Sequence, residues 1–403
     1  MHIAFVHSGA DLYGASRALL RLAAALIERG RRVTVILPYD GDLRPALERC
    51  GTTVLLHSSM TILTRPSASG SIRQLLLLPF SFFELVRLFR RLRPDVVHSN
   101  TAVILSAAPA AWILGIPHIC HIREFFAEFP ILWKFYRSYI AWFSTVIVCV
   151  SHAVAAQFEV GIRERKVRVI YDGIPELELR RDSTAAACRE QFGLDEHSLV
   201  AGVVGRIKTT RKGQEILVRA AALLKDRYPQ ARYLLVGSPF PGNESHLISL
   251  KAAMRASGVE DRFILTGDLA DVAPAYACLD VLVLPSAMPE PFGLVLIEAM
   301  ARRIPVIATS AGGPPEIIDH DRSGLLVPPG DAHALARALD RLFADRQLRL
   351  QLAANGRARF ESMFEFNGFV DRMSALYSET IRLAPVWRAS RLCVKNESGT
   401  RNL

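Results

Sequence analysis

Two glutamates bracket a short, mostly apolar stretch of the sequence, and their carboxylates could bind hydroxyl groups of a ligand. The stretch is PEPFGLVLIEAM, residues 289–300, and Glu290 and Glu298 stand eight positions apart in it. The residues before it, LDVLVLPSAM, read as a short apolar strand that runs into a loop, and a helix is expected to start near Gly293. Carboxylates accept two hydroxyl hydrogen bonds well, so Glu290 could bind sugar hydroxyls and Glu298 a vicinal diol such as a ribose. A surface helix could also carry both glutamates without any ligand.

Two further features near strand ends suit phosphate groups. The expected helix start at residues 292–295 offers backbone N–H groups and the positive end of the helix dipole. The motif GVVGRIKTTRKGQEIL puts Arg206 just past an apolar strand and Lys212 before a helix. A forked guanidinium and a compact ammonium at a strand end suit a diphosphate. Solvated loop charges are the alternative interpretation.

A glycine turn follows the first apolar strand and opens the first helix. In HSGADLYGASRALL, Gly9 and Gly14 are five positions apart, so the motif is not the GxGxxG dinucleotide fingerprint of dehydrogenases. A glycine turn into a helix N-terminus still presents unpaired N–H groups to an anion, which makes Gly14 a candidate donor contact. These glycines could also serve only to permit a tight turn.

Short apolar strands alternate with helical stretches along the whole chain. One series runs HIAFVHS, RVTVILP, TVLLH, DVVHSN, IPHICHIR and TVIVCVS, and a second runs LVAGVVGR, ARYLLVG, FILTG, VLVLP and IPVIATS. Such Val and Ile runs indicate parallel sheets covered on both faces. We expect two facing doubly wound α/β domains, 1–175 and 190–365, and a C-terminal helix and tail, 366–403, crossing back toward the first. Ligands would bind in the cleft at the strands' carboxyl ends.

Composition limits the class of protein and the compartment. The chain has 403 residues and a net charge of +10. Residues 1–175 hold 20 Lys and Arg against 12 Asp and Glu, so +8 of that charge lies in the first half. The excess suits nucleic acid, an anionic membrane or a phosphorylated substrate, or only a soluble surface. Six scattered cysteines without a CxxC pair, and an N-terminus that reads as a strand, favour the cytoplasm.

Several of these segments together resemble the retaining glycosyltransferases of family four. Their signature of two glutamates separated by seven residues is similar to EPFGLVLIEAMA here. The resemblance continues through IPVIATSAGGPPEIIDHDRSGLLVPPGD, GVVGRIKTTRKGQ, VCVSHAVAAQF and VRVIYDGI, and it spans most of the chain. It implies the GT-B architecture of two facing Rossmann-like domains with an interdomain cleft.

The resemblance also implies roles for individual residues on the donor side. Arg206 and Lys212 would bind the donor diphosphate, Glu298 the nucleotide ribose, and Glu290 the transferred sugar. Backbone N–H groups around Phe292, Gly293 and Leu294 would position sugar and phosphate.

On the acceptor side, PHICHIREFF matches the place where family members put a histidine beside the reacting sugar. His121 is the catalytic candidate, with Arg123 and Glu124 as acceptor contacts. His98 in DVVHSN is a weaker candidate, because a histidine at a strand end is often only structural.

The sequence departs from the family pattern at four places. The common GGAER turn reads YGASR, with Tyr13 and Ser16 where the family has other residues. The spacing from Arg206 to Lys212 is one residue longer than expected, so Arg211 or Lys208 could share the phosphate role. Asp172 stands in place of asparagine, and Pro291 in place of a frequent glycine.

The reaction that the resemblance implies is transfer of a sugar from a nucleoside-diphosphate donor to a hydroxyl, retaining the α configuration. No metal and no cofactor are expected, because cations and helix N-termini can neutralise the departing diphosphate. A nucleotide-sugar epimerase and a non-catalytic binding scaffold are the alternatives, and the glutamate pair argues against nucleic-acid binding.

Acceptor identity is less constrained. The acceptor would be a glycan, a lipid-linked glycan or a small molecule. The apolar, arginine-ended segment 72–94 suggests peripheral contact with an anionic inner membrane face, or only a helix packed on the sheet with Pro79 marking its start. Aromatic residues after His121 could form an apolar lip around the acceptor or only part of the core: Phe125, Phe126, Phe129, Trp133, Phe135 and Tyr136.

The apolar window 102–120 contains two prolines. It predicts a buried helix followed by a strand and not a membrane span.

Overall fold

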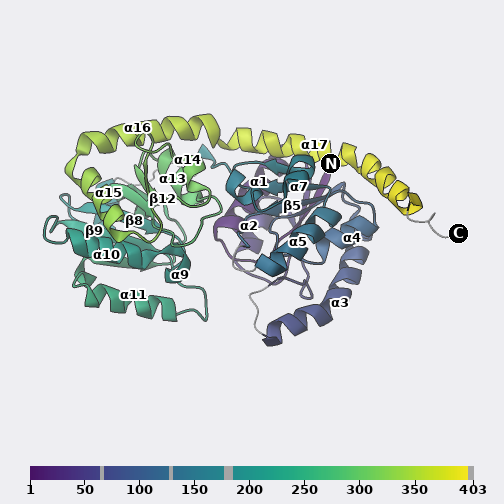
Figure 1. The fold of residues 1–403 in the computed structure, drawn as a ribbon, viewed down its shortest axis with the longest axis horizontal. Helices are drawn as coiled ribbons and strands as arrows, with labels where there is room; N and C mark the ends of the chain where they lie inside the picture. Colours follow the sequence, from purple (N-terminus) through teal and green to yellow (C-terminus); the bar gives the residue numbers. More distant parts are fainter. Residues whose placement is uncertain (64–67, 127–129, 177–184, 398–403) are drawn as a thin grey trace. The chain divides into compact units, whose positions relative to one another are not determined.

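The computed structural model describes residues 1–63, 68–126, 130–176 and 185–397. The chain divides into two compact units (Figure 1), of which unit 1 comprises Met1–Tyr171 with Phe369–Leu403 and unit 2 comprises Asp172–Gly368. Each unit is built around one parallel sheet with helices packed on it, so the predicted pair of parallel-sheet α/β domains is confirmed. Of the stretch between the two predicted domains, residues 177–184 lie outside the described residues.

Unit 1 contains a seven-stranded sheet in the order β3-β2-β1-β4-β5-β6-β7, and every pairing is parallel. The central strands are buried throughout because helices cover them, as their continuous apolar sequences require. The strands are β1 (His2–Val6), β2 (Arg32–Leu37), β3 (Thr53–Leu56), β4 (Val96–Ser99), β5 (His118–Ile122), β6 (Val146–Cys149) and β7 (Val167–Val169).

The helices of unit 1 connect successive strands, and the last helix enters this unit from unit 2. Gly30, with a left-handed φ of 70°, follows the end of α1 as the sequence predicts. The helices are α1 (Gly14–Glu28), α2 (Leu43–Arg49), α3 (Ala68–Leu92), α4 (Ala107–Ile113), α5 (Pro130–Phe143), α6 (His152–Ala155), α7 (Val160–Lys166) and α17 (Phe366–Glu397).

Unit 2 contains a six-stranded parallel sheet in the order β10-β9-β8-β11-β12-β13. Its main core packs Leu217 of α10 (Gln214–Leu224) and Leu339 of α15 (Ala332–Ala344) against Tyr233 and the other sheet residues. The strands are β8 (Leu199–Val204), β9 (Ala231–Val236), β10 (Phe263–Gly267), β11 (Val281–Leu284), β12 (Val306–Thr309) and β13 (Leu325–Val327).

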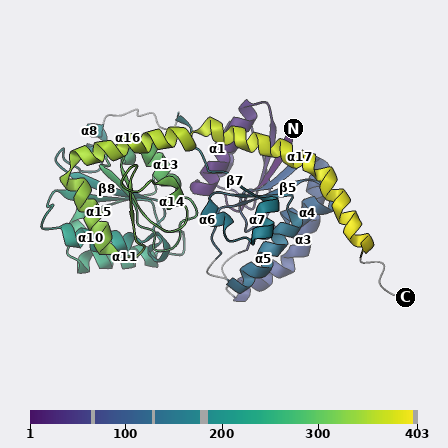
Figure 2. The same ribbon diagram turned by 45° about the horizontal axis from the view of Figure 1, so that its top comes forward.

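The helices of unit 2 are short, apart from those that cover the sheet (Figure 2). They are α8 (Ala185–Gln191), α9 (Thr209–Lys212), α10 (Gln214–Leu224), α11 (Ser245–Ala256), the 3₁₀ turn Glu260–Arg262, α12 (Ala273–Ala277), α13 (Leu294–Ala301), α14 (Pro314–Ile317), α15 (Ala332–Ala344) and α16 (Arg346–Met363).

Some elements differ from the sequence-based expectation. The prediction that Pro79 marks the start of its helix is wrong, because α3 begins at Ala68 and Pro79 lies exposed within it. The strands β7 and β13, three residues each, were not predicted as strands. The window 102–120 contains α4 followed by the first residues of β5, as predicted.

Candidate active site

In unit 2, the predicted donor residues gather where three neighbouring strands end. Strands β8, β11 and β12 are adjacent in the sheet. Arg206 and Lys212 follow β8, Glu290 follows β11, and the glycine pair Gly312–Gly313 follows β12. Because the carboxyl ends of parallel strands meet at one edge, the topology alone brings these loops together.

Lys212 and Glu290 form an ion pair at this edge. Nζ of Lys212 lies 2.7 Å from Oε2 of Glu290, and the hydroxyl of Ser286 donates to the same oxygen at 3.1 Å. The Lys212 side chain is 34% exposed and that of Glu290 14%. The lysine is therefore fixed by a carboxylate and still reaches solvent, where a phosphate could contact it. The sequence predicted both residues but not their pairing.

Gly213 sets the distance between the loop after β8 and the loop after β11. Its φ is +65°, and a Cβ there would lie 1.9 Å from the carbonyl oxygen of Pro285. Next to this contact, the amides of Ala287 and Met288 donate to the carbonyl of Arg211. Only glycine permits this approach, which holds Lys212 beside the glutamate loop.

The backbone of Glu290 is held by the glycine pair after β12. The amide of Glu290 donates to the carbonyl of Ala311 at 3.1 Å, and the amide of Gly313 donates to the carbonyl of Glu290 at 2.8 Å. A Cβ on Gly312, whose φ is +86°, would lie 2.1 Å from that same Glu290 carbonyl oxygen. These glycines therefore fix the position of the backbone from which the Glu290 carboxylate extends.

Glu298, on α13, is oriented by a residue that the sequence analysis missed. The hydroxyl of the fully buried Tyr276 donates to Oε2 of Glu298 at 2.8 Å. Arg302 lies over the Tyr276 ring at 4.7 Å and donates to the carbonyl of Glu298 at 3.0 Å. Tyr276 lies in APAYACLD, a segment without polar patterning, so nothing in the sequence marked it.

The start of α13 agrees with the predicted helix N-terminus. Gly293, with φ of 110°, precedes the first helical residue, Leu294. The Phe292 side chain is 4% exposed and packs edge-on against Phe364 at 6.0 Å between ring centroids. Phe292 therefore contributes its ring to the core, and only its backbone could serve the predicted donor role.

Arg206, the other predicted cation, packs on an aromatic ring. Its guanidinium lies 4.8 Å from the centroid of Phe240, and its carbonyl accepts from Nε2 of Gln214 at 2.9 Å. Arg211 and Lys208, the alternatives for the phosphate role, are half-buried in the same loop. All four predicted basic positions therefore lie within one turn-and-helix segment.

In unit 1, a polar network connects the ends of β1 and β4 to the start of α1. His7 bonds Ser16 at 2.9 Å through Nε2, and its Nδ1 lies 3.2 Å from Nδ2 of Asn100. Asn100 also donates to the carbonyl of Ala15, next to Gly14, at 3.1 Å. Burial lowers the pKa of His7 to about 4, so it is neutral. His7 and Asn100 were not singled out from the sequence, although both lie at the carboxyl ends of the predicted strand segments and directly follow β1 and β4.

His121 and His98 stack on one another inside unit 1. Their ring centroids are 5.4 Å apart, and Nδ1 of His98 lies 2.8 Å from the hydroxyl of Tyr377 on α17. Both histidines are fully buried, and neither ring nitrogen of His121 has a hydrogen-bond partner in the described protein. Burial, and then the charge of Arg123, holds the pKa of each well below the ordinary range. The structure places His121 in the interior, not at an open edge.

Glu124 follows β5 and is poised to change charge near neutrality. Its Oε2 accepts from the amides of Arg123 at 2.9 Å and Ala102 at 3.3 Å. Burial raises the pKa of Glu124 to about 7 despite these bonds. Such a carboxyl can exchange a proton with a hydroxyl at physiological pH.

The aromatic residues after His121 divide between core and surface. Phe126, Trp133 and Tyr136 are buried, and the first two stack at 4.5 Å. Phe135 is 71% exposed, Phe125 is half-buried, and Phe129 lies outside the described residues.

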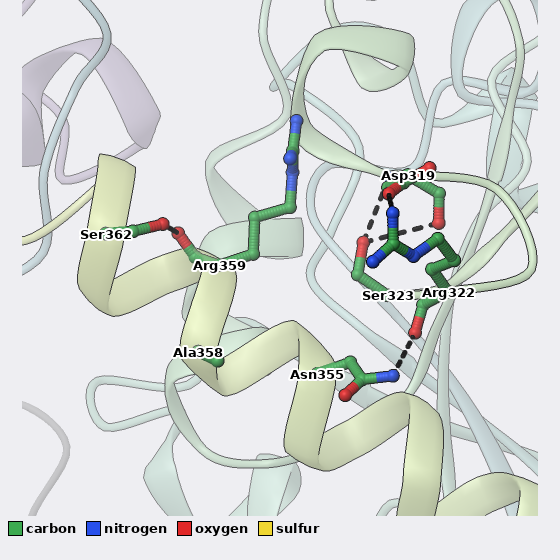
Figure 3. Close-up of a pocket in the computed structure, with 7 residues that line it drawn as sticks. All are labelled: Asp319, Arg322, Ser323, Asn355, Ala358, Arg359 and Ser362. Carbon is green, nitrogen blue, oxygen red and sulfur yellow. Dashed lines mark hydrogen bonds and ion pairs between the residues drawn. The ribbon is translucent and has the colours of Figure 1, made fainter.

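A surface cavity of about 400 Å³ on unit 2 does not coincide with these residues. It is lined by residues of α16 and of the loop after α14 (Figure 3): Asp319, Arg322, Ser323, Asn355, Ala358, Arg359 and Ser362. Arg359 donates to the carbonyls of Ile317 and Glu316, so its guanidinium already has partners. None of the lining residues is a predicted site residue.

The described residues contain neither a cluster of metal ligands nor a membrane-spanning helix. Within residues 1–63, 68–126, 130–176 and 185–397, no three His, Cys, Asp or Glu side chains lie together as metal ligands would. No helix in that part of the chain combines the length and the apolarity that crossing a membrane requires.

Two family models match consecutive parts of the chain. Residues 13–176 match the model described as Glycosyltransferase Family 4, and residues 186–359 match the one described as Glycosyl transferases group 1. Together the two matches cover most of both units.

Curated relatives match over shorter stretches. A D-inositol 3-phosphate glycosyltransferase from Corynebacterium kroppenstedtii is 31% identical over 208 residues, which are 51% of this chain and 46% of that protein. An N-acetyl-alpha-D-glucosaminyl L-malate synthase from Bacillus anthracis is 27% identical over 241 residues, 59% of this chain and 61% of that protein. The chain thus spans about half the length of the curated relatives it matches.

A solved structure matches nearly the whole chain. It is Anabaena Alr3699/HepE in complex with UDP-glucose, with a TM-score of 0.81 and 25% sequence identity, covering 94% of this chain and 100% of that one. The matches to both family models and to this structure agree with the parallel-sheet architecture of the two units. The chain belongs to the family-4 type of glycosyltransferases and has their GT-B fold.

Proposed function

We propose that this protein transfers a sugar from a nucleoside-diphosphate donor to a hydroxyl acceptor and retains the α configuration. The observation that carries the proposal is the grouping of Lys212, Glu290 and Arg206 at one sheet edge, with Glu298 on the helix that follows. Solved complexes of Alr3699/HepE with UDP and with UDP-glucose support the donor class.

Each donor group has a matching partner in this proposal. Lys212 and Arg206 neutralise the diphosphate, as do the first amides of α13. Glu298, oriented by Tyr276, accepts hydrogen bonds from the ribose hydroxyls. Glu290 accepts from the transferred sugar with the carboxylate oxygen that faces away from Lys212, and Gly293 and Leu294 position the sugar through their backbones.

The chemical step requires charge stabilisation more than covalent catalysis. The bond between the anomeric carbon and the diphosphate oxygen breaks, and a bond to the acceptor oxygen forms on the same face of the sugar. The acceptor's proton passes to the departing phosphate oxygen. Fixed cations and dipoles aimed at the developing charge are worth about 3 kcal/mol each in other enzymes. In this proposal the step needs no metal and no cofactor.

In this proposal the acceptor is bound by residues of unit 1. Glu124, with its pKa of about 7, and Arg123 contact the acceptor, while His98 and His121 are fully buried. For His121 to touch the reacting sugar, the residues that bury it must move on substrate binding. The acceptor class is a glycan or a lipid-linked glycan, and the reaction takes place in the cytoplasm, where the described cysteines would stay free as observed.

The donor proposal is tested by titrating the purified protein with UDP, GDP and ADP sugars and following both thermal stabilisation and nucleotide release. At least one donor should stabilise the parent, and Glu298→Ala should weaken that binding about tenfold or more, because a charge-assisted hydrogen bond pair is lost. Glu196→Ala, which removes an 87% exposed carboxylate of unit 2, is the matched control.

Three results would contradict the proposal, each a different part of it. If no nucleotide sugar stabilises the parent, the donor class is wrong. If Glu298→Ala binds as well as Glu196→Ala, the ribose role is wrong. If NMR of the product shows inversion at the anomeric carbon, the retaining mechanism is wrong.

A further inference from the structure

Helices α3, α4 and α5 cover one face of the unit 1 sheet. The chain passes from β3 through β4 and β5 to β6, and right-handed crossovers in that direction put all three connecting helices on the same side. Helix α4 contacts both α3 and α5. Figure 2 shows the three helices grouped together on unit 1.

The sides of these helices that face the sheet are already packed in the core. Leu85, Val86 and Phe89 of α3 are buried in the sheet core, and Trp133 and Ile140 of α5 are buried as well. Segment 72–94 therefore does pack on the sheet, which is one of the two interpretations that the sequence allowed. The remaining question is what the opposite side of each helix does.

The outward side of α3 carries an apolar stripe. Leu76 is 76% exposed, Phe80 57% and Phe83 63%, and their spacing of four and three residues places them on one helix face. The same stripe continues as Arg87 and Arg90, both exposed. Along its axis the helix surface thus changes from apolar to cationic within about 15 Å.

Helix α5 repeats the pattern. Ile131 is 78% exposed, Phe135 71% and Trp142 56%, again at helical spacing. Half of the large exposed hydrophobic residues in the described part of the chain lie on these three helices, and we call this set the α3–α5 apolar surface: Leu76, Phe80, Phe83, Ile113, Ile131, Leu132, Phe135 and Trp142. Single exposed apolar residues are ordinary, but a cluster of this kind marks an interaction surface.

The charges around this surface select among the possible partners. Arg87, Arg90, Arg91 and Arg93 are exposed at the end of α3, and Lys134 is exposed on α5. Glu84, the acid within the α3 stretch, is bonded to Ser59. A second copy of this chain would present the same cations and be repelled, whereas an anionic lipid headgroup layer would be attracted.

We propose that the α3–α5 apolar surface binds the face of an anionic lipid bilayer. The Leu and Phe side chains enter the boundary between headgroups and acyl chains, Trp142 lies at the interface, and the arginines contact lipid phosphates. Apart from the indole of Trp142, the side chains of this surface are hydrocarbon only and offer no directional hydrogen bonds, as expected for a lipid partner and not for a specific protein partner. This contact would bring unit 1 to a lipid-linked acceptor, but its test requires no nucleotide sugar.

Flotation of the full-length protein with lipid vesicles tests the proposal. The parent should float at low ionic strength with vesicles of equal parts phosphatidylglycerol and phosphatidylcholine, and not with phosphatidylcholine alone. The double variant Phe83→Asp/Phe135→Asp should reduce the partition coefficient at least tenfold, since each aromatic loses its burial. Arg87→Gln/Arg90→Gln should reduce it less and flatten its salt dependence.

The matched control is Ile248→Asp, which places the same charge on a residue of α11 that is 67% exposed in unit 2. It should float like the parent, and unchanged melting temperatures of all variants should show that they fold. The proposal is overturned if the parent stays with the lipid-free fraction. It is equally overturned if Phe83→Asp/Phe135→Asp floats like Ile248→Asp, or if light scattering shows a lipid-free dimer that this double variant dissociates.

Discussion

Tyr276 shows how a side chain without access to solvent can decide the geometry of a partly exposed carboxylate. It is fully buried, it donates to Oε2 of Glu298, and its ring supports Arg302, which in turn bonds the Glu298 carbonyl. Both ends of the glutamate are therefore tied to one aromatic residue. In our proposal Tyr276 positions Glu298 for the ribose without touching the donor.

Removal of the tyrosine hydroxyl should weaken donor binding with little effect on the chemical step. Tyr276→Phe keeps the ring beneath Arg302, so we expect the donor KM to rise about three- to tenfold, the effect of one hydrogen bond, while kcat changes little. The measurement is initial-rate kinetics with the donor found by titration. In a Glu298→Ala background the same substitution should have no further effect, and additive losses would show that Tyr276 acts elsewhere.

The residue types at strand ends could be predicted from the sequence, but which side chains pair with one another could not. Arg206, Lys212 and Glu290 were singled out because each lies in the segment beyond a recognisable strand, and Glu298 because it stands eight positions after Glu290 in the helix that follows. The ion pair between Lys212 and Glu290 joins positions 78 residues apart and depends on side-chain direction, which strand and helix periodicity does not specify. The full burial of His121 was missed for the same reason.

At the scale of elements, glycines determine how closely the loops of unit 2 approach one another. Gly213 fits against the carbonyl of Pro285, and Gly312 against the carbonyl of Glu290. Both contacts exclude a Cβ, and both fix a loop that carries a predicted donor residue. The carboxyl ends of the strands form the edge at which these loops meet, and the glycines determine how closely the loops approach one another there.

A methyl group at Gly312 should therefore displace the glutamate loop. Gly312→Ala adds backbone strain of about 1–3 kcal/mol and a clash with the Glu290 backbone, so donor affinity should fall at least tenfold. Gly330→Ala is the matched control, because Gly330 has a similar φ of +78° but nothing within 4 Å of its Cβ position. Donor titration followed by calorimetry compares the two, and equal affinities would contradict the role given to Gly312.

The sequence predicted the alternation of strands and helices well because buried parallel strands are continuous apolar runs. It failed where an element was too short to show a period, as with the three residues each of β7 and β13. It also failed at Pro79, where proline was taken as a helix start although α3 continues on both sides of it.

At the scale of the whole molecule, unit 1 holds several histidines that folding keeps neutral. Burial lowers the pKa of His7 to about 4, that of His118 to about 3, and those of His98 and His121 well below the ordinary value of 6.5. Below pH 6.5 the unfolded chain binds protons that the folded chain excludes. The stability of unit 1 should therefore fall as the pH decreases from 6.5 toward 4.

One histidine can be removed to measure this effect. His118 lies between the hydroxyls of Ser99 and Ser144, and His118→Gln should reduce the pH dependence of the unfolding free energy by about 1.4 kcal/mol per pH unit between pH 6 and 4. Urea denaturation at several pH values measures the slope. Ser99→Ala, which removes the hydrogen bond and no titrating group, should keep the parent slope; a steeper or unchanged slope in His118→Gln would contradict the prediction.

The position of helix α17 at the end of the chain affects when unit 1 can complete its folding during translation. Unit 1 comprises Met1–Tyr171 and Phe369–Leu403, so its last packing partners, among them Tyr377 against His98, leave the ribosome at the end of translation. During synthesis of the intervening residues, the parts of unit 1 that α17 contacts, among them the rings of Phe5 and His98, remain uncovered. A stop codon shortly before position 369 should therefore leave unit 2 able to fold and unit 1 prone to aggregate.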